Sequence, residues 1–154
     1  MDEAYGEKIE EQRSEGVVEP ANHRAKGVEF CIPHKPVVKE RAETTKLRIV
    51  YDASAKAQVD AVSLNDCLNP GPVLQNNMWN ILVRSRVHPV AVNRDLKKSF
   101  LEERVKEEDM DALRFHCQPG GSAELETLRF TRVMFGLTSS PFLLGGVIEH
   151  HLNV

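Results

Sequence analysis

The feature that most constrains the fold is the run RFTRVMFGLTSSPF, residues 129–142, in which a strand-like segment meets a glycine and a helix signal follows. Residues 129–134 favour an extended strand, and the break comes at Phe135 and Gly136. A helix start follows, with Pro141 in the first turn and serine and threonine available as N-caps. The expected N-caps are Thr138, Ser139 and Ser140.

Backbone N–H groups are expected to converge just after Gly136. A glycine lets a ligand approach the backbone closely, and the start of a helix favours negative charge. This turn is therefore a candidate seat for a phosphate or a base pair. On its own, the same pattern also fits a strand, turn and helix that bind nothing.

The rest of the chain carries both strand and helix signals, so we expect both kinds of element. The best helix, 73–86, carries an apolar stripe that predicts core packing, namely Leu74, Met78, Ile81 and Leu82. Helices are expected over 2–13, 73–86 and 140–152, and extended segments over 17–20, 30–38, 47–51, 89–93, 101–105, 112–117 and 127–134. The last two should form a hairpin around a turn at 119–121. The buried side of the last helix should comprise Phe142, Leu143, Val147, Ile148 and Leu152.

Composition places further limits on the chain. With 154 residues, of which 41% are hydrophobic, the chain can bury one core, so we expect one domain or part of one. No apolar run reaches the length of a membrane span and no signal-peptide pattern opens the sequence, so we expect an intracellular, cytoplasmic protein that is not secreted. Cys31, Cys67 and Cys117 are widely spaced and are expected to be reduced and structural.

The net charge of −3 argues weakly against nucleic-acid binding, but the charges are unevenly distributed. Residues 46–104 carry nine Lys and Arg against six Asp and Glu, whereas both flanking parts are net negative. The middle of the chain is therefore the part best suited to a polyanion.

Four segments carry a family resemblance. KLRIVYDASAK (46–56), SLNDCLNPGP (63–72), DLKKSFL (95–101) and RFTRVMFGLTSSPF (129–142) occur in the order and approximate spacing found in reverse transcriptases of the BEL/Pao class of LTR retrotransposons. Residues 12–19 and 32–38 also resemble the lead-in to that domain. The resemblance implies an α+β fold, namely a partial right-hand polymerase with an antiparallel sheet and packed helices. Its N-terminal lead-in and fingers segment would cover 1–45, and partial fingers and palm would cover 46–154.

The resemblance also implies roles for particular residues. Asp95 would be a catalytic carboxylate and a ligand of Mg²⁺ or Mn²⁺, with the Leu96 carbonyl as a second oxygen. Arg48 would contact the incoming triphosphate, because a guanidinium can make paired bonds to phosphate oxygens. Phe100 would pack under the deoxyribose and clash with a 2′-hydroxyl. The remaining implied dNTP-binding residues are Ser99, Phe135 and Gly136, and those for the template-primer are Ser140 and Pro141.

Without the resemblance, the same residues would be interpreted as having structural roles only. Arg48 would be a surface arginine paired with Asp52, Asp95 a capping residue and Phe100 a core residue. The chain also departs from the family pattern at five positions. Arg94 stands where the family usually has a small or uncharged residue, and Lys97 and Lys98 stand where it more often has an acidic and a basic residue. Glu102 replaces a common glutamine, and Met134 replaces the usual proline. His34 and Lys35 are expected to be exposed, and the adjacent His150 and His151 do not face a common ion on a helix.

The sequence contains no Asp-Asp pair, and the Tyr-x-Asp-Asp hairpin that supplies the other carboxylates in these polymerases does not occur before Val154. We therefore expect that this chain does not polymerise by itself or hold Mg²⁺ tightly, and that an uncovered apolar face promotes self-association. Two hypotheses remain. The chain is a fragment of an RNA-directed DNA polymerase whose partners are an RNA or DNA template-primer and dNTP, or it is a noncatalytic remnant that acts at most as a small nucleic-acid-binding module. A membrane partner is not expected.

Overall fold

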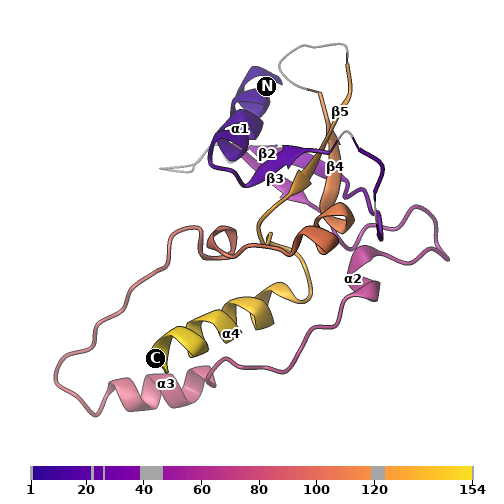
Figure 1. Cartoon of the computed structure of the whole chain (residues 1–154). Coiled ribbons are helices and arrows are strands. Elements are labelled where there is room, and N and C mark those ends of the chain that lie inside the picture. Colours follow the sequence, from indigo (N-terminus) through magenta and orange to yellow (C-terminus); the bar gives the residue numbers. More distant parts are fainter. Residues whose placement is uncertain (1, 22, 26, 39–46, 119–123, 154) are drawn as a thin grey trace.

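The computed structural model describes residues 2–21, 23–25, 27–38, 47–118 and 124–153. The α-helices are α1 (Asp2–Ser14), α2 (Leu64–Cys67), α3 (Met78–Ser85) and α4 (Ser140–Leu152), and two 3₁₀ helices are η1 (Ser99–Glu102) and η2 (Glu107–Leu113). The strands are β1 (Val18–Pro20), β2 (His34–Val38), β3 (Leu47–Tyr51), β4 (Arg114–Cys117) and β5 (Glu126–Phe130). The α+β prediction is confirmed, and Figure 1 shows both sheets and α1 gathered at one end of the molecule.

Two antiparallel sheets form the body of the protein. The first has the order β1-β5-β4, with Val18 opposite Phe130 and Arg114 opposite Arg129. The predicted hairpin is thus confirmed as β4 and β5, while its turn at 119–121 lies outside the described residues. The second sheet pairs β2 with β3 along their whole length. The boundary expected at residue 45 also lies outside the described residues, and segments from both sides of it pair in each sheet.

Helix α1 lies against the body with Tyr5, Ile9 and Gln12 on its inner side. Ile9 is buried, and the Gln12 amide oxygen accepts a hydrogen bond of 3.2 Å from the Tyr51 hydroxyl. The helix stops where Gly16 adopts a φ of +67°, a backbone conformation that favours glycine. The chain then turns directly into β1, which places α1 beside β3.

The core of the body is an aromatic cluster between the sheets. The Phe115 and Phe130 side chains are fully buried, and the Tyr51 ring lies 5.1 Å and 4.8 Å from theirs, edge to face. His34 was expected to be exposed, and this was wrong, because its ring packs against Tyr51 and Phe115 and bonds to the Tyr5 hydroxyl. This burial lowers the pKa of His34.

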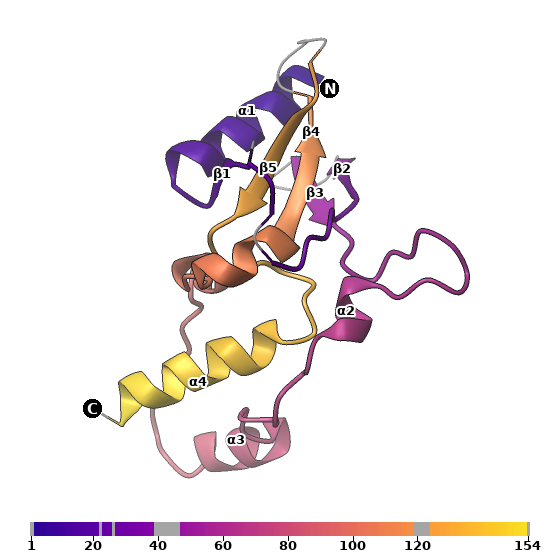
Figure 2. The ribbon, with the colours of Figure 1, turned by 45° about the vertical axis from the view of Figure 1, so that its right-hand side comes forward.

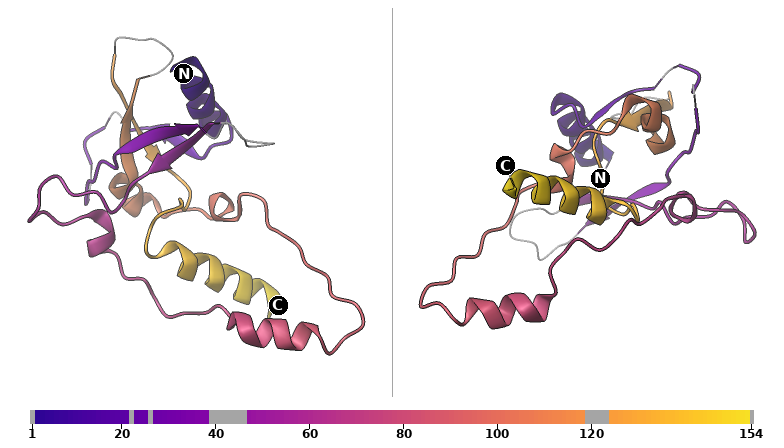
Figure 3. Two further views of the ribbon diagram at one scale, coloured as in Figure 1. Left: turned by 180° about the vertical axis from the view of Figure 1, so that it is seen from behind. Right: turned by 60° about the horizontal axis from the view of Figure 1, so that its bottom comes forward.

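Residues 71–98, here called the arm, leave the body as an open loop that passes beside α4 and returns at η1 (Figures 1 and 3). Helix α3 begins at Met78 and not at 73, because the Asn77 side chain caps it by accepting a bond of 2.9 Å from the Trp79 N–H. The predicted core packing of this helix is wrong. Nothing in α3 is buried, and Trp79 is 71% exposed.

Two predicted strands are also absent. Residues 89–93 lie in the arm without strand structure, because extended backbone there meets no partner strand among the described residues. Residues 101–105 begin within η1 instead. The chain then pairs with the segment after β5 through an isolated bridge between Arg104 and Arg132, so only its end behaves like a strand.

Helix α4 has the predicted bounds but little of the predicted burial. Phe142 and Ile148 are half-buried, whereas Leu143, Val147 and Leu152 are exposed. The arm touches α4 through glycine, since a Cβ built on Gly71 would clash with the Phe142 ring. Figure 2 shows α4 between the body and α3, with its outer side uncovered by any described element.

No helix in the described part of the chain is long and apolar enough to cross a membrane. The three cysteines are free: Cys117 lies in the core, while Cys31 and Cys67 are exposed.

Candidate functional site

The site that gathers most of the sequence-predicted residues is a groove of about 590 Å³ between α1, β3 and the turn at Gly136. Its walls are mainly apolar, and they include Tyr51, Leu101, Phe130, Met134 and Phe135. Charged side chains stand at its edge, including Arg48, Lys98 and the α1 residues Lys8, Glu11 and Glu15. An apolar cleft with a few charged groups suits a ligand that has both a flat apolar part and a charged part.

Arg48 lies in β3, where the alternation of half-buried and exposed residues places it on the outer face. The ordinary reading paired this arginine with Asp52. The Asp52 carboxylate instead accepts a hydrogen bond of 3.0 Å from the Ser54 N–H. Within the part of the chain that the structure describes, no ion pair neutralises Arg48. Arg48 is therefore a cation at the groove edge that no described carboxylate neutralises.

Phe100 and Phe135 are 35 positions apart in the chain, yet their rings meet edge to face with centroids 4.5 Å apart. Phe100 comes from η1, which also contains Ser99, and Phe135 comes from the glycine turn. The Phe135 side chain remains 62% exposed, although it lies in the groove wall. The sequence reasoning assigned both residues to one ligand, and the structure brings them together.

Gly136 has a φ of +92°, and a Cβ at this position would lie 3.4 Å from the Tyr51 carbonyl oxygen. The turn therefore requires glycine both for its conformation and for its approach to β3. Thr138, whose N–H is one of those expected to converge after Gly136, is bonded within the protein. Its N–H donates to Asn65 Oδ1 at 2.9 Å.

Asn65 is the residue that sequence reasoning missed. It lies in the segment SLNDCLNPGP, which carries part of the family resemblance but to which no binding residue was assigned. Its partners at Gly136 and Thr138 are more than 70 positions away, and no local pattern reveals such a contact.

Ser140 and Pro141 stand at the start of α4, but the serine faces inward. Ser140 is buried, and its hydroxyl donates to the Met134 carbonyl at 2.7 Å. The expected capping by a serine side chain is not seen at Ser139, which occupies the N-cap position without such a bond. Pro141 is exposed, and its carbonyl accepts a bond of 3.3 Å from Gln75 of the arm.

Asp95 and Leu96 lie in the arm and outside the groove, and both are exposed. The described residues contain no group of three or more His, Cys, Asp or Glu side chains that could hold a metal ion. A Mg²⁺ site needs more negative oxygens than one carboxylate provides. The described residues alone therefore do not fit the metal that Asp95 is expected to bind.

Lys98 connects the end of the arm to α1. Its ammonium lies 2.6 Å from Glu15 and 3.6 Å from Glu11, and hydrogen bonding to Glu15 raises the pKa of Lys98. The backbone of Lys98 adopts a left-handed conformation with a φ of 53°, which is uncommon for a residue other than glycine. This contact spans the groove edge between η1 and α1.

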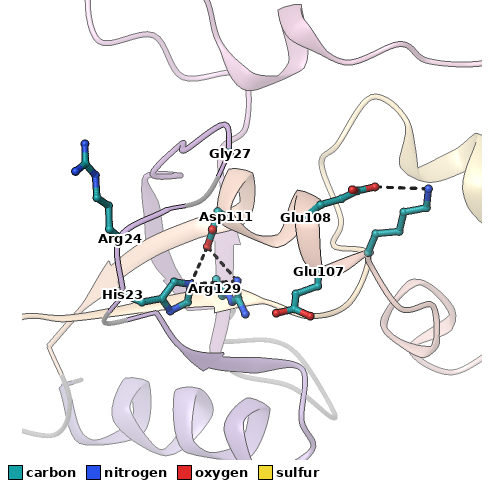
Figure 4. Close-up of a pocket in the computed structure, with 8 residues that line it drawn as sticks. His23, Arg24, Gly27, Glu107, Glu108, Asp111 and Arg129 are labelled. Atoms are coloured by element: carbon teal, nitrogen blue, oxygen red, sulfur yellow. Dashed lines mark hydrogen bonds and ion pairs between the residues drawn. The ribbon is translucent and has the colours of Figure 1, made fainter.

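A second, polar pocket of about 730 Å³ lies on the body beside η2 (Figure 4). Its floor is an ionic network in which Asp111 bonds to Arg114 at 2.9 Å and to Arg129 at 3.1 Å, while His23 lies 3.6 Å away. Arg129 also pairs with Glu19. Carboxylates therefore neutralise the two buried arginines of this floor. We interpret this ionic network as a structural contact that holds η2, β1, β4 and β5 together.

Comparisons with known proteins identify the fold. The crystal structure of the prototype foamy virus protease-reverse transcriptase matches with a TM-score of 0.65 at 18% sequence identity. The match covers 99% of this chain and 18% of the viral chain. No family model matches the sequence, and no curated protein matches it. The chain therefore has the fold of part of a retroviral reverse transcriptase and spans less than a fifth of that protein's length.

Proposed function

We propose that this chain is the fingers and N-terminal palm portion of an RNA-directed DNA polymerase of the BEL/Pao type, and that its groove seats the incoming deoxynucleoside triphosphate. The observation that carries the proposal is the meeting of Arg48, Phe135 and Gly136 in one groove, with Phe100 against Phe135. These four residues come from three of the segments that resemble the family. The retroviral fold supports the same interpretation.

Each part of the groove suits one part of such a ligand. The exposed ring of Phe135 and the apolar wall around Tyr51 suit a base and a sugar, which have flat or apolar faces. Arg48 lies at the edge, pairs with no carboxylate among the described residues, and suits phosphate oxygens. Phe100 supports Phe135 from outside the groove, so its size would affect how closely a sugar approaches.

Nucleotide addition would require further carboxylates. Asp95 would be one ligand of Mg²⁺ or Mn²⁺ in an intact enzyme, together with carboxylates that the described residues do not supply. Ser140 and Pro141 would support the template-primer through the start of α4. In this proposal the chain binds nucleotide but does not by itself carry out catalysis.

The test is a titration of the ¹⁵N-labelled protein with dATP and Mg²⁺, followed by the backbone amide signals. We expect shifts at Arg48, Phe135 and Gly136, and loss of these shifts in Arg48→Ala, because the phosphate then lacks its cation. Lys35→Ala is the matched control, since Lys35 is an exposed cation on the neighbouring strand β2 and does not line the groove. Absence of shifts at saturating dATP, or shifts that Arg48→Ala leaves unchanged, would refute the proposal.

A noncatalytic nucleic-acid-binding module is the second candidate. The arm favours it, because it presents Arg84, Arg86, Arg94 and Lys97 together with the exposed Trp79. Phosphate contacts release counterions, so binding to single-stranded nucleic acid through the arm should weaken steeply between roughly 50 and 200 mM salt. Salt-dependent binding that Trp79→Ala weakens and Arg48→Ala does not would favour this candidate over the nucleotide groove.

A further inference from the structure

Asn65 makes side-chain hydrogen bonds to two backbone groups of the glycine turn. Its Nδ2 donates to the Gly136 carbonyl at 2.8 Å, and its Oδ1 accepts from the Thr138 N–H at 2.9 Å. The same Nδ2 also donates to the Ser54 hydroxyl at 2.9 Å. A carbonyl can only accept and an N–H can only donate, so the orientation of the Asn65 amide is fixed by chemistry. Both its donors and its acceptor are engaged.

The short helix α2 is held in place from several sides. Ser63 and Asp66 form a capping box, in which each side chain bonds the backbone of the other residue. Lys56 pairs with Asp66 at 2.9 Å, and the Asn65 N–H donates to the Ala53 carbonyl at 3.0 Å. The buried Leu64 anchors the helix in the core. Asn65 is thus presented to the turn from a rigid support.

The turn itself needs such support. Gly136 has no side chain and a φ of +92°, so rotation of the peptide unit that follows it meets little steric resistance. Two orientations of the Gly136 carbonyl are then available to the backbone. The bond from Asn65 selects the one in which the oxygen points toward α2. In the other orientation, the partial negative charge of the oxygen would be available to the groove, where it would repel a phosphate.

We propose that Asn65 is the positioning residue of the groove, which holds the turn 136–138 in the orientation that accepts a deoxynucleoside triphosphate. Asn65 does not line the groove and acts only through Gly136 and Thr138. This inference rests on the proposed function for the identity of the ligand. Its effect on the turn can be measured without any ligand.

The experiment compares the full chain with Asn65→Ala and Asn65→Asp. Asn80→Asp is the matched control, because Asn80 is an exposed asparagine of α3. Amide hydrogen exchange is recorded first without ligand, at a temperature where urea unfolding shows every variant to be folded. We expect exchange at Thr138 to rise about tenfold in Asn65→Ala, as loss of one such bond implies. The amides of Leu128 and Phe130 should change little.

Affinity for dATP with Mg²⁺ is then measured for the same proteins at neutral and at mildly acidic pH. Both variants should bind about tenfold more weakly at neutral pH. When the carboxyl of Asn65→Asp is protonated it can donate to Gly136 and accept from Thr138, so acidification should restore its affinity relative to the original protein measured in parallel. Asn65→Ala should show no such recovery. A merely structural role would predict no pH-dependent recovery in a variant that is already folded.

Unchanged exchange at Thr138 in Asn65→Ala would overturn the inference, and so would faster exchange with unchanged dATP affinity. An equal rise at Leu128 and Phe130 would show that Asn65 supports the whole body and not the turn, which also overturns it. If the original protein binds no dATP, the proposed function fails, and exchange at Thr138 then decides alone whether Asn65 holds the turn.

Discussion

The body and the arm carry equally apolar sequences, but only the body buries them. Phe115 is fully buried between two sheets and α1, whereas Trp79 of the arm is 71% exposed on a helix without any buried residue. An amphipathic pattern indicates which side of a helix is apolar, but it does not show which element, if any, packs against that side. In the described residues the arm contacts α4 near its start, where Gly71, Leu74 and Gln75 lie, and its last residue, Lys98, pairs with α1. Stability should therefore depend on the body, and association on the arm.

The largest expected effect is the difference in the free energy of unfolding between substitution of the buried Phe115 and substitution of the exposed Trp79. Phe115→Ala removes a ring from the closed core and should lower the free energy of unfolding by about 3–5 kcal/mol. Trp79→Ala removes an exposed ring and should change it by about 0.5 kcal/mol or less. Urea unfolding followed by circular dichroism measures both. A large effect of Trp79→Ala in dilute monomer would contradict the comparison.

The next effect concerns the buried ionic network of the body. Asp111→Asn leaves Arg114 and Arg129 close together without the carboxylate between them, which should lower the free energy of unfolding by roughly 3 kcal/mol. Glu108→Gln is the matched control, because the Glu108 side chain is 76% exposed and pairs only loosely with Lys106. Equal effects of the two substitutions in urea unfolding would show that the network does not support the body.

The glycine turn joins the body to α4 and should show an intermediate effect. Gly136→Ala forces a side chain into the left-handed region and against the Tyr51 carbonyl, at a cost of roughly 1–2 kcal/mol. Gly27→Ala is the control, since a Cβ there meets only the Glu108 carbonyl at 3.6 Å. Thermal unfolding should show a lower midpoint for the first variant alone, and equal midpoints would argue against a strained turn.

Two carboxyl groups flanking the arm should respond to pH in opposite directions. Bonds from the Ser63 backbone and from Lys56 lower the pKa of Asp66 to about 2, so the stability it contributes is present at neutral pH and is lost as pH falls from about 4 toward 2. Burial raises the pKa of Glu103, and one of its oxygens is buried without a hydrogen-bond partner among the described residues. Its unfavourable contribution therefore grows as pH rises above the usual glutamate range.

Asp66→Asn should reduce the loss of the free energy of unfolding at acidic pH. Glu103→Gln should raise the free energy of unfolding at neutral pH. Urea midpoints measured from pH 2.5 to 7 test both expectations. A Glu103→Gln protein that is less stable than the original at pH 7 would show that the charged form of Glu103 has a favourable partner.

The smallest expected change concerns the surface of the arm. Trp79 is the only tryptophan in the sequence, so its fluorescence reports on the arm alone. If the exposed apolar face self-associates, emission should shift to shorter wavelength as protein concentration rises, and Leu82→Lys should suppress the shift. Analytical ultracentrifugation provides the mass. A monomer at all concentrations with unchanged emission would show that this face does not self-associate.

The sequence predicted the elements whose signals are local. The extended segment of β3, the β4-β5 hairpin and the bounds of α4 all follow from residues that are close in the chain. Burial was predicted less well, because it depends on which other elements are near. His34 was expected at the surface and lies among aromatic rings, while Leu82 was expected in the core and is 49% exposed.

The candidate site shows the same division. Arg48, Phe100, Phe135 and Gly136 were nominated from segments that resemble a family, and three of them line one groove while the fourth packs against it. Asp95 came from the same reasoning but lies in the open arm, because residues 89–93 pair with no strand in the described part of the chain. Asn65 could not be nominated, since its role depends on contacts to a distant turn.

Photocrosslinking with a dATP analogue that carries a photoreactive base, followed by peptide mapping, would locate the nucleotide on the protein. We expect crosslinks within 47–51 and 134–136, competed by unlabelled dATP and lost in Arg48→Ala. Crosslinks confined to the arm around Trp79, or to the polar pocket around His23 and Arg129, would contradict the claim that the groove binds the nucleotide.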